Sequence, residues 1–130
     1  MKFTDNNYRY RILVVEDNLG TLKIIEKILA TEYEIDAENN GEDAVKKAAS
    51  SKYDLILMDI SLGLGINGIQ AAARIKNNGD NTNTPIIAMT AYEADYYNEI
   101  NDKNLFNGYL EKPFELKALT DLVQNIFISE

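Results

Sequence analysis

The chain has 130 residues, of which 45% are hydrophobic and 26% charged, which is typical of a soluble domain with a single core. It contains neither cysteine nor histidine, so disulfide frameworks, zinc sites built from these ligands and histidine-activated nucleophiles are excluded. The net charge of −8 argues against direct binding of nucleic acid, and the longest apolar runs, of four or five residues, are too short to span a membrane.

The first half of the chain predicts three strands, each followed by a helix. The first apolar run, residues 12–15, precedes a segment with helical apolar spacing that begins after Asn18. Residues 33–37 alternate in part and predict an edge strand, and a second helix opens at residues 40–43. Residues 55–58 predict a fully buried strand, and a third helix follows the Asn-Gly pair at residues 67–68.

The second half predicts two further strand–helix units. Residues 77–85 form a polar loop, and residues 85–89 form the fourth strand. The helix expected at 93–103 has a weak apolar stripe, and the tyrosines at its start fit a partner surface and half-buried packing equally well. A short fifth strand at residues 109–110 precedes a well-patterned last helix, which contains residues 116–126.

This order of elements predicts an α/β fold of the (βα)5 type. All-apolar strands that alternate with helices are typical of a five-stranded parallel sheet with helices on both faces. The commonest arrangement of five such units is the flavodoxin-like strand order 2-1-3-4-5. No linker, internal repeat or low-complexity tract interrupts the pattern, so we expect one domain over residues 1–130.

Polar residues follow four of the predicted strands. Glu16 and Asp17 come after the first strand, Asp59 after the third, Thr90 after the fourth and Lys112 after the fifth. Because the carboxyl ends of parallel strands meet at one edge, the three carboxylates should converge on one crevice. At roughly 4 Å and an effective dielectric near 20, each pair of like charges costs about 4 kcal/mol. A raised pKa of one carboxyl group would offset this cost, and a bound Mg²⁺ ion would offset it better.

The lysine and the threonine extend this cluster to a predicted phosphoryl site. A metal held by acids, an ammonium group and a hydroxyl are the groups that stabilise a transferring phosphoryl group. Since the chain has no histidine and no cysteine, the group that accepts the phosphoryl must be a carboxylate.

Four short motifs make the sequence resemble the receiver domain of two-component response regulators, a CheY-like family. They are Glu16-Asp17-Asn18 after ILVV, Asp59 after LILM, Met89-Thr90-Ala91 after PIIA, and Tyr109-x-x-Lys112-Pro113-Phe114. The resemblance covers about residues 9–127, and the four motifs together, in this order, are highly specific. It implies a cytoplasmic signalling module rather than an enzyme. Its phosphoryl group would come from a histidine kinase or a histidine phosphotransfer protein.

The resemblance also implies roles for the acidic residues. Asp59 matches the phosphoacceptor, which would form an aspartyl phosphate and so make the chain a phosphoprotein. Asp17 matches the direct ligand of Mg²⁺, and Glu16 matches the acid that usually holds the metal through water. Ser61 matches the residue whose backbone carbonyl completes the metal site.

The remaining motif residues match the parts that respond to phosphorylation. Thr90 matches the switch hydroxyl, and Tyr109 matches an aromatic side chain that swings inward behind it. Lys112 matches the lysine that pairs with the phosphoryl oxygens, and its bond to Pro113 is expected to be cis. The helix at 93–103, the fifth strand and the last helix would form the face that binds a downstream protein.

The same residues allow other interpretations. Each motif residue alone is an ordinary loop, cap or strand-end residue, and only their combination argues for a site. A pseudo-receiver that acts without phosphorylation is the main alternative, although such modules usually lack the acid pair, the acceptor or the lysine. The acids after the first strand would repel a flavin phosphate, and a haloacid-type phosphatase would have an aspartate at the position of Ser61.

The loop SLGLGING, residues 61–68, departs from the pattern of the family. Gly63 stands where receivers commonly have proline, and the Asn67-Gly68 turn comes one residue late. Because glycine has unusual backbone freedom, we expect this loop to be more mobile than its counterparts.

Overall fold

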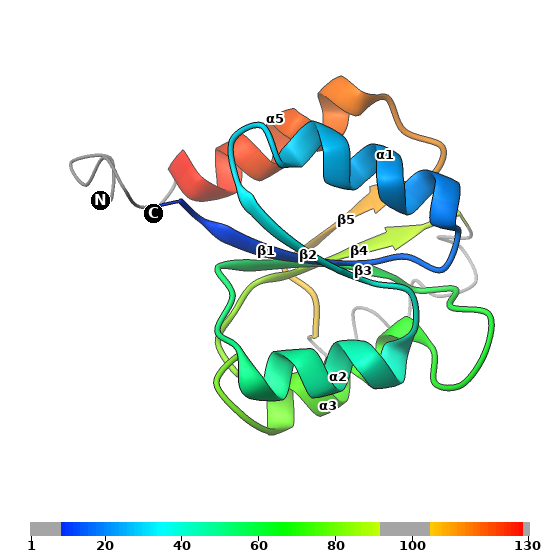
Figure 1. Cartoon of the computed structure of the whole chain (residues 1–130). Coiled ribbons are helices and arrows are strands. Elements are labelled where there is room, and N and C mark those ends of the chain that lie inside the picture. Colours follow the sequence, from blue (N-terminus) through cyan, green and yellow to red (C-terminus); the bar gives the residue numbers. More distant parts are fainter. Residues whose placement is uncertain (1–8, 92–104, 129–130) are drawn as a thin grey trace.

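The computed structural model describes residues 9–91 and 105–128, which contain five strands and four helices (Figure 1). The elements are β1 (Arg11–Val15), α1 (Leu19–Leu29), β2 (Glu34–Glu38), α2 (Gly41–Ser50), β3 (Leu55–Asp59), α3 (Gly68–Asn77), β4 (Ile86–Thr90), β5 (Gly108–Glu111) and α5 (Leu116–Ile128). All neighbouring strands are parallel, and their order is β2-β1-β3-β4-β5. The strand order predicted from the sequence is therefore confirmed.

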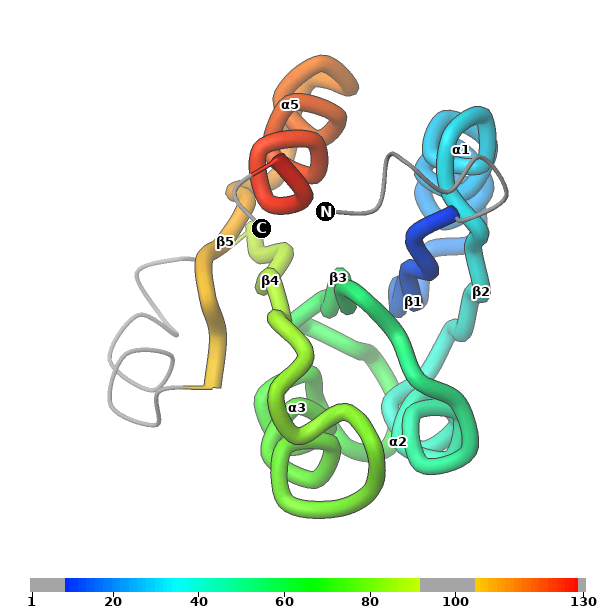
Figure 2. Tube along the Cα trace, turned by 90° about the vertical axis from the view of Figure 1, so that its left-hand side faces the viewer, coloured from blue at the N-terminus to red at the C-terminus, as the bar shows by residue number. Residues whose placement is uncertain are grey.

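Helices cover both faces of the sheet, with α1 and α5 on one side and α2 and α3 on the other (Figures 1 and 2). The division follows from the twofold alternation of side chains along each strand. In β1, for example, Ile12 and Val14 pack toward α1 and α5, whereas Leu13 and Val15 pack toward α2 and α3. The central strands are buried on both faces, which explains why their sequences are apolar without interruption.

Asparagine residues begin three of the helices, as the sequence indicates. The side chains of Asn18, Asn40 and Asn67 each accept a hydrogen bond from a backbone N–H in the first turn of the helix that follows. At Asn67 the bond is reciprocated by Gln70, which forms a capping box. These caps fix the places where the chain turns from a strand end into a helix.

Aromatic stacking joins the entry to β1 with the last helix. The rings of Tyr10 and Phe127 lie parallel, with centroids 3.9 Å apart. Tyr33, just before β2, contacts the same phenylalanine with a centroid distance of 5.3 Å. The amino ends of β1 and β2 and the end of α5 are therefore packed together.

The element limits differ from the predicted ones by one or two residues. β2 begins at Glu34 rather than at Tyr33, because Tyr33 closes the end of α1 through a backbone bond to Leu29. Asp59 and Thr90 are the last residues of β3 and β4 rather than the first loop residues after them. The Lys112–Pro113 bond is cis, as expected. The helix predicted at 93–103 and its tyrosines lie outside the described residues.

The polar loop between α3 and β4 contains two buried residues, which the sequence did not indicate. Asn81 and Thr84 are almost completely inaccessible to solvent. The side-chain amide of Asn81 donates to the carbonyls of Ala48 and Ser51 and accepts from the backbone N–H of Tyr53. Asn81 therefore links the end of α2 to the start of β3.

Among the described residues no helix has the length and apolar character needed to cross a membrane.

Candidate functional site

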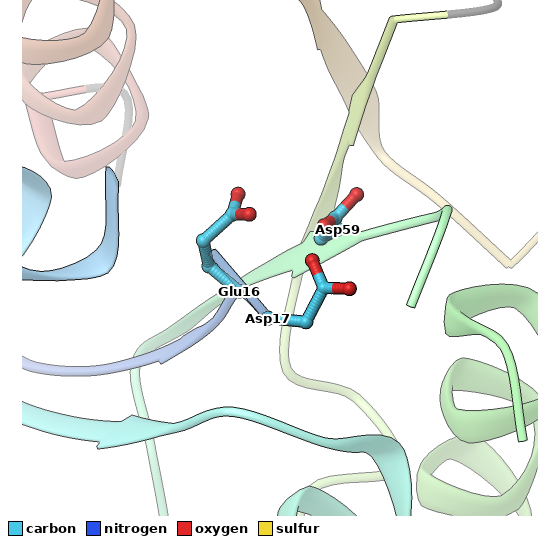
Figure 3. A group of neighbouring side chains, drawn as sticks. All are labelled: Glu16, Asp17 and Asp59. Atoms are coloured by element: carbon cyan, nitrogen blue, oxygen red, sulfur yellow. The ribbon is translucent and has the colours of Figure 1, made fainter. Parts of the chain in front are cut away.

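Three carboxylates meet at the carboxyl edge of the sheet. Glu16 and Asp17 follow β1, and Asp59 ends β3, which lies beside β1 (Figure 3). One oxygen atom from each carboxylate lies within 4.8 Å of the other two. Glu16 and Asp59 are only 1% and 3% exposed, whereas Asp17 is exposed at the rim. The structure thus brings together the acids that the strand pattern predicted to converge.

Lys112 enters the cluster from the residue after β5. Its Nζ atom lies 2.5 Å from Glu16 Oε1 and 3.5 Å from Asp59 Oδ2. Its backbone N–H donates to the carbonyl of Thr90 at 2.7 Å, which holds the two strand ends together. Among the described residues, Lys112 is the one basic residue that pairs with this cluster of three carboxylates, so the crevice keeps an excess of negative charge.

Backbone N–H groups fix one oxygen of each carboxylate. The N–H of Asn18 donates to Glu16 Oε2 at 3.1 Å, that of Ser61 to Asp59 Oδ1 at 3.0 Å, and that of Gly63 to Asp17 Oδ2 at 2.9 Å. Two of these donors come from the loop after β3. The orientation of the acids therefore depends on the path of that loop.

The pKa of Asp59 shows the cost of this arrangement. Burial of the carboxyl group is the main cause that raises this pKa, from its usual 3.8 to about 7, and the neighbouring charge of Glu16 adds to the effect. The Lys112 ammonium and the Ser61 backbone N–H act in the opposite direction but do not compensate. Asp59 is thus a buried acid whose ionised form lacks sufficient positive charge nearby.

The donor set fits a hard divalent cation. Clustered carboxylate oxygens are the ligands that Mg²⁺ prefers, and two protein carboxylates leave the rest of an octahedron to water and phosphoryl oxygens. Asp17 Oδ1 accepts no hydrogen bond within the described part of the chain, so it is available to a metal. The charge excess and this oxygen are the observations that support a metal at the site.

The other residues singled out from the sequence lie around this cluster. Thr90 is fully buried at the end of β4, where Asp59 of the neighbouring strand pairs with Met89. Tyr109 lies in β5 beside Ala88 and is 36% exposed. Ser61 lies next to the cluster, and its buried hydroxyl has no partner within the described residues.

Gly68 contributes to the site, although the sequence indicates it only as part of a turn. A Cβ atom at this position would lie 2.8 Å from the Cα of Ile60 and 2.9 Å from the carbonyl carbon of Asp59. The backbone N–H of Gly68 also donates to the carbonyl of Ile60 at 3.0 Å. The start of α3 therefore packs directly against the end of β3, which only glycine permits.

With this geometry established, the comparisons with known proteins assign the chain to a family. The sequence-family model of the response regulator receiver domain matches residues 12–124, so the chain belongs to the response regulator receiver family. It is a module of two-component signalling. The chain is 37% identical over 111 residues to the response regulator ArlR of Staphylococcus saprophyticus. That match covers 84% of this chain and 48% of ArlR, so the chain spans about half of its curated relative.

Two solved structures of receivers are also similar. The receiver domain of a sensor histidine kinase from Pseudomonas aeruginosa, with magnesium coordinated in its active-site cleft, gives a TM-score of 0.81 at 33% identity. The match covers 91% of this chain and 97% of that one. The response regulator TrrA from Thermotoga maritima, in complex with Mg(2+)-BeF, gives a TM-score of 0.78 at 33% identity, covering 90% and 98%. Both of these similar structures contain magnesium, and in the Pseudomonas receiver it is coordinated in the active-site cleft.

Proposed function

We propose that this chain is a phosphoacceptor receiver domain, in which Asp59 takes a phosphoryl group from a phosphohistidine donor. The donor would be a histidine kinase or a histidine phosphotransfer protein. The observation that carries the proposal is the cluster itself, in which Glu16, Asp17 and Asp59 lie together and Lys112 pairs with two of them. A protein has little structural reason to bury two acids beside a third unless the site serves chemistry.

The proposed reaction is a substitution at phosphorus. An oxygen of Asp59 forms the new P–O bond while the P–N bond to the donor imidazole breaks, and the imidazole leaves with the electron pair and takes up a proton. Asp17 and Glu16 would hold Mg²⁺, Glu16 through water, together with the backbone carbonyl of Ser61. Bound there, the metal would neutralise charge on the transferring phosphoryl oxygens.

Lys112 and Thr90 would serve the product. The Lys112 ammonium already lies 3.5 Å from Asp59 Oδ2 and would pair with a phosphoryl oxygen attached there. The hydroxyl of Thr90 would donate to another oxygen, and Tyr109 would turn inward into the space behind it. Since an aspartyl phosphate adds about two negative charges, this local change would bias the protein between two states.

The output of this switch would be a change in one surface. We infer that residues 93–103 with β5 and α5 form the face that binds a downstream protein. The module would act in the cytoplasm as a single domain over residues 1–130, without binding nucleic acid or membrane directly. Its only catalysis would be Mg²⁺-dependent assistance to its own phosphorylation and dephosphorylation.

The test uses acetyl phosphate as the phosphoryl donor. The chain is incubated with acetyl phosphate and Mg²⁺ and examined by intact-mass spectrometry, beside Asp59→Asn and a sample with excess EDTA. We expect one added phosphoryl group on the native chain with Mg²⁺ and none on the variant or without metal. A native chain that gains no phosphoryl group here or from any phosphohistidine donor would instead be a pseudo-receiver that acts by binding alone.

A further inference from the structure

The loop after β3 and the first turn of α2 pack into each other in a reciprocal way. The side chain of Ile66 lies against Gly41, where an added Cβ would be 2.6 Å from Ile66 Cγ1. The carboxylate of Glu42 lies against Gly65, where an added Cβ would be 2.5 Å from Glu42 Oε2. Each glycine thus leaves room for the side chain that comes from the other segment. We call these four residues, Gly41, Glu42, Gly65 and Ile66, the loop clasp.

Hydrogen bonds connect the clasp to the acid cluster. Glu42 Oε2 accepts the backbone N–H of Ile66 at 2.9 Å, and Asp17 Oδ2 accepts the backbone N–H of Gly63 at 2.9 Å. Between these two anchors the chain projects outward, and Leu64 at the tip is 87% exposed. Gly65 has a φ of +76°, a backbone conformation that favours glycine and makes a sharp turn between the anchors.

We propose that Glu42 is a positioning residue for the metal site. By holding Ile66, Glu42 fixes the loop so that the N–H of Gly63 orients Asp17 and the N–H of Ser61 orients Asp59. The proposal rests on the proposed function, since it concerns the acids assigned to Mg²⁺. Groups that orient metal ligands typically affect affinity although they do not touch the metal.

The clasp compensates for the unusual composition of this loop. The extra residue and the glycines of SLGLGING increase the number of conformations that the free loop can adopt. Without an anchor at Ile66, the Gly63 N–H would be held near Asp17 only by its own hydrogen bond. Glu42 supplies that anchor from a rigid helix whose start is fixed by Asn40.

A simpler role for Glu42 is stabilisation of the N-terminus of α2, where a negative charge is favourable. Asp43 provides the matched control, because it is also an exposed acid in that first turn. Its side chain accepts a hydrogen bond from Asn40, and no hydrogen bond links it to the loop. If charge at the helix terminus were all that mattered, the two residues would be interchangeable in their effect on the metal site.

The experiment is a calorimetric titration with Mg²⁺ of the native chain, Glu42→Ala, Glu42→Gln and Asp43→Ala. Glutamine keeps an oxygen that can accept the Ile66 N–H but carries no charge. We expect Mg²⁺ to bind about tenfold more weakly to Glu42→Ala, and within about threefold of native to Glu42→Gln and Asp43→Ala. Urea unfolding in EDTA verifies that each variant is folded.

A second variant disrupts the same contact by changing Gly65, the residue against which Glu42 packs. Gly65→Ala would expel the Glu42 carboxylate and weaken Mg²⁺ binding to a similar extent, and Glu42→Ala combined with Gly65→Ala should be no weaker than either alone. Native affinity in Glu42→Ala, or an equal loss in Asp43→Ala, would by itself overturn the role of Glu42, because Gly65→Ala also strains the backbone at a φ of +76°. A native chain that binds no Mg²⁺ would instead overturn the proposed function.

Discussion

Replacement of Asp59 by asparagine should stabilise the metal-free protein, and by an amount that depends on pH. Asparagine resembles the protonated acid in shape, so it removes the cost of ionising a buried carboxyl group while its oxygen can still accept the Ser61 N–H. The native chain loses stability as pH rises, because the pKa of Asp59 is about 7 in the folded state against a usual 3.8. Between these values the folded state binds more protons than the unfolded one.

The expected magnitude follows from that difference. Three pKa units at about 1.4 kcal/mol each give an advantage of about 4 kcal/mol for Asp59→Asn at pH 8. The advantage falls to about 1.5 kcal/mol at pH 5 and vanishes below about pH 3, where aspartate is protonated in both states. The measurement is the free energy of unfolding by urea in EDTA at several pH values.

The matched control is Asp80→Asn, which changes an exposed aspartate on the loop between α3 and β4. It should leave the free energy of unfolding within about 0.5 kcal/mol of native at every pH. Equal stability of Asp59→Asn and the native chain at pH 8, or an advantage that does not grow from pH 5 to pH 8, would refute the electrostatic reasoning. It would mean that the crevice tolerates its charges without a metal.

Two further variants separate the charge of the site from the packing of the fold. Lys112→Met should destabilise the metal-free protein by about 3–5 kcal/mol at pH 8, because it leaves the buried carboxylates of Glu16 and Asp59 unpaired. Urea unfolding measures this loss, and adding Asp59→Asn should recover much of it; no recovery would show that the lysine acts by packing. Asn81→Ala should cost about 3 kcal/mol, since several buried backbone groups lose their partner, yet Mg²⁺ affinity measured by calorimetry should stay native. A large change in that affinity would contradict a purely structural role for Asn81.

The convergence of the acids could be predicted because it depends on few assumptions. Parallel strands place their carboxyl ends on one edge, so Glu16, Asp17 and Asp59 had to be neighbours once the strands were located. The helix starts were equally accessible, because asparagine before an apolar periodic segment is a local signal. Repulsion among the acids also followed from the sequence, but burial, the larger cause of the raised pKa of Asp59, required the structure.

Side-chain contacts that depend on how a helix lies beside a loop could not be predicted. Glu42 and Ile66 are 24 residues apart, and their hydrogen bond depends on how α2 lies beside the loop. The glycines of that loop indicated only backbone flexibility, whereas the structure shows the carboxylate of Glu42 packed against Gly65. The role of Asn81 could not be predicted for a similar reason, since the local sequence of a polar loop does not indicate hydrogen bonds to distant backbone carbonyls.

The stack of Tyr10 on Phe127 has a practical consequence for measuring the site. Tyr10 precedes β1 and Glu16 follows it, so the five residues of that strand separate the stack from the acids by roughly 16 Å. A fluorophore or an affinity tag attached near the stack would therefore lie at the edge of the sheet opposite the crevice. Such a probe would leave the crevice free for the tests of magnesium binding and phosphoryl transfer proposed above.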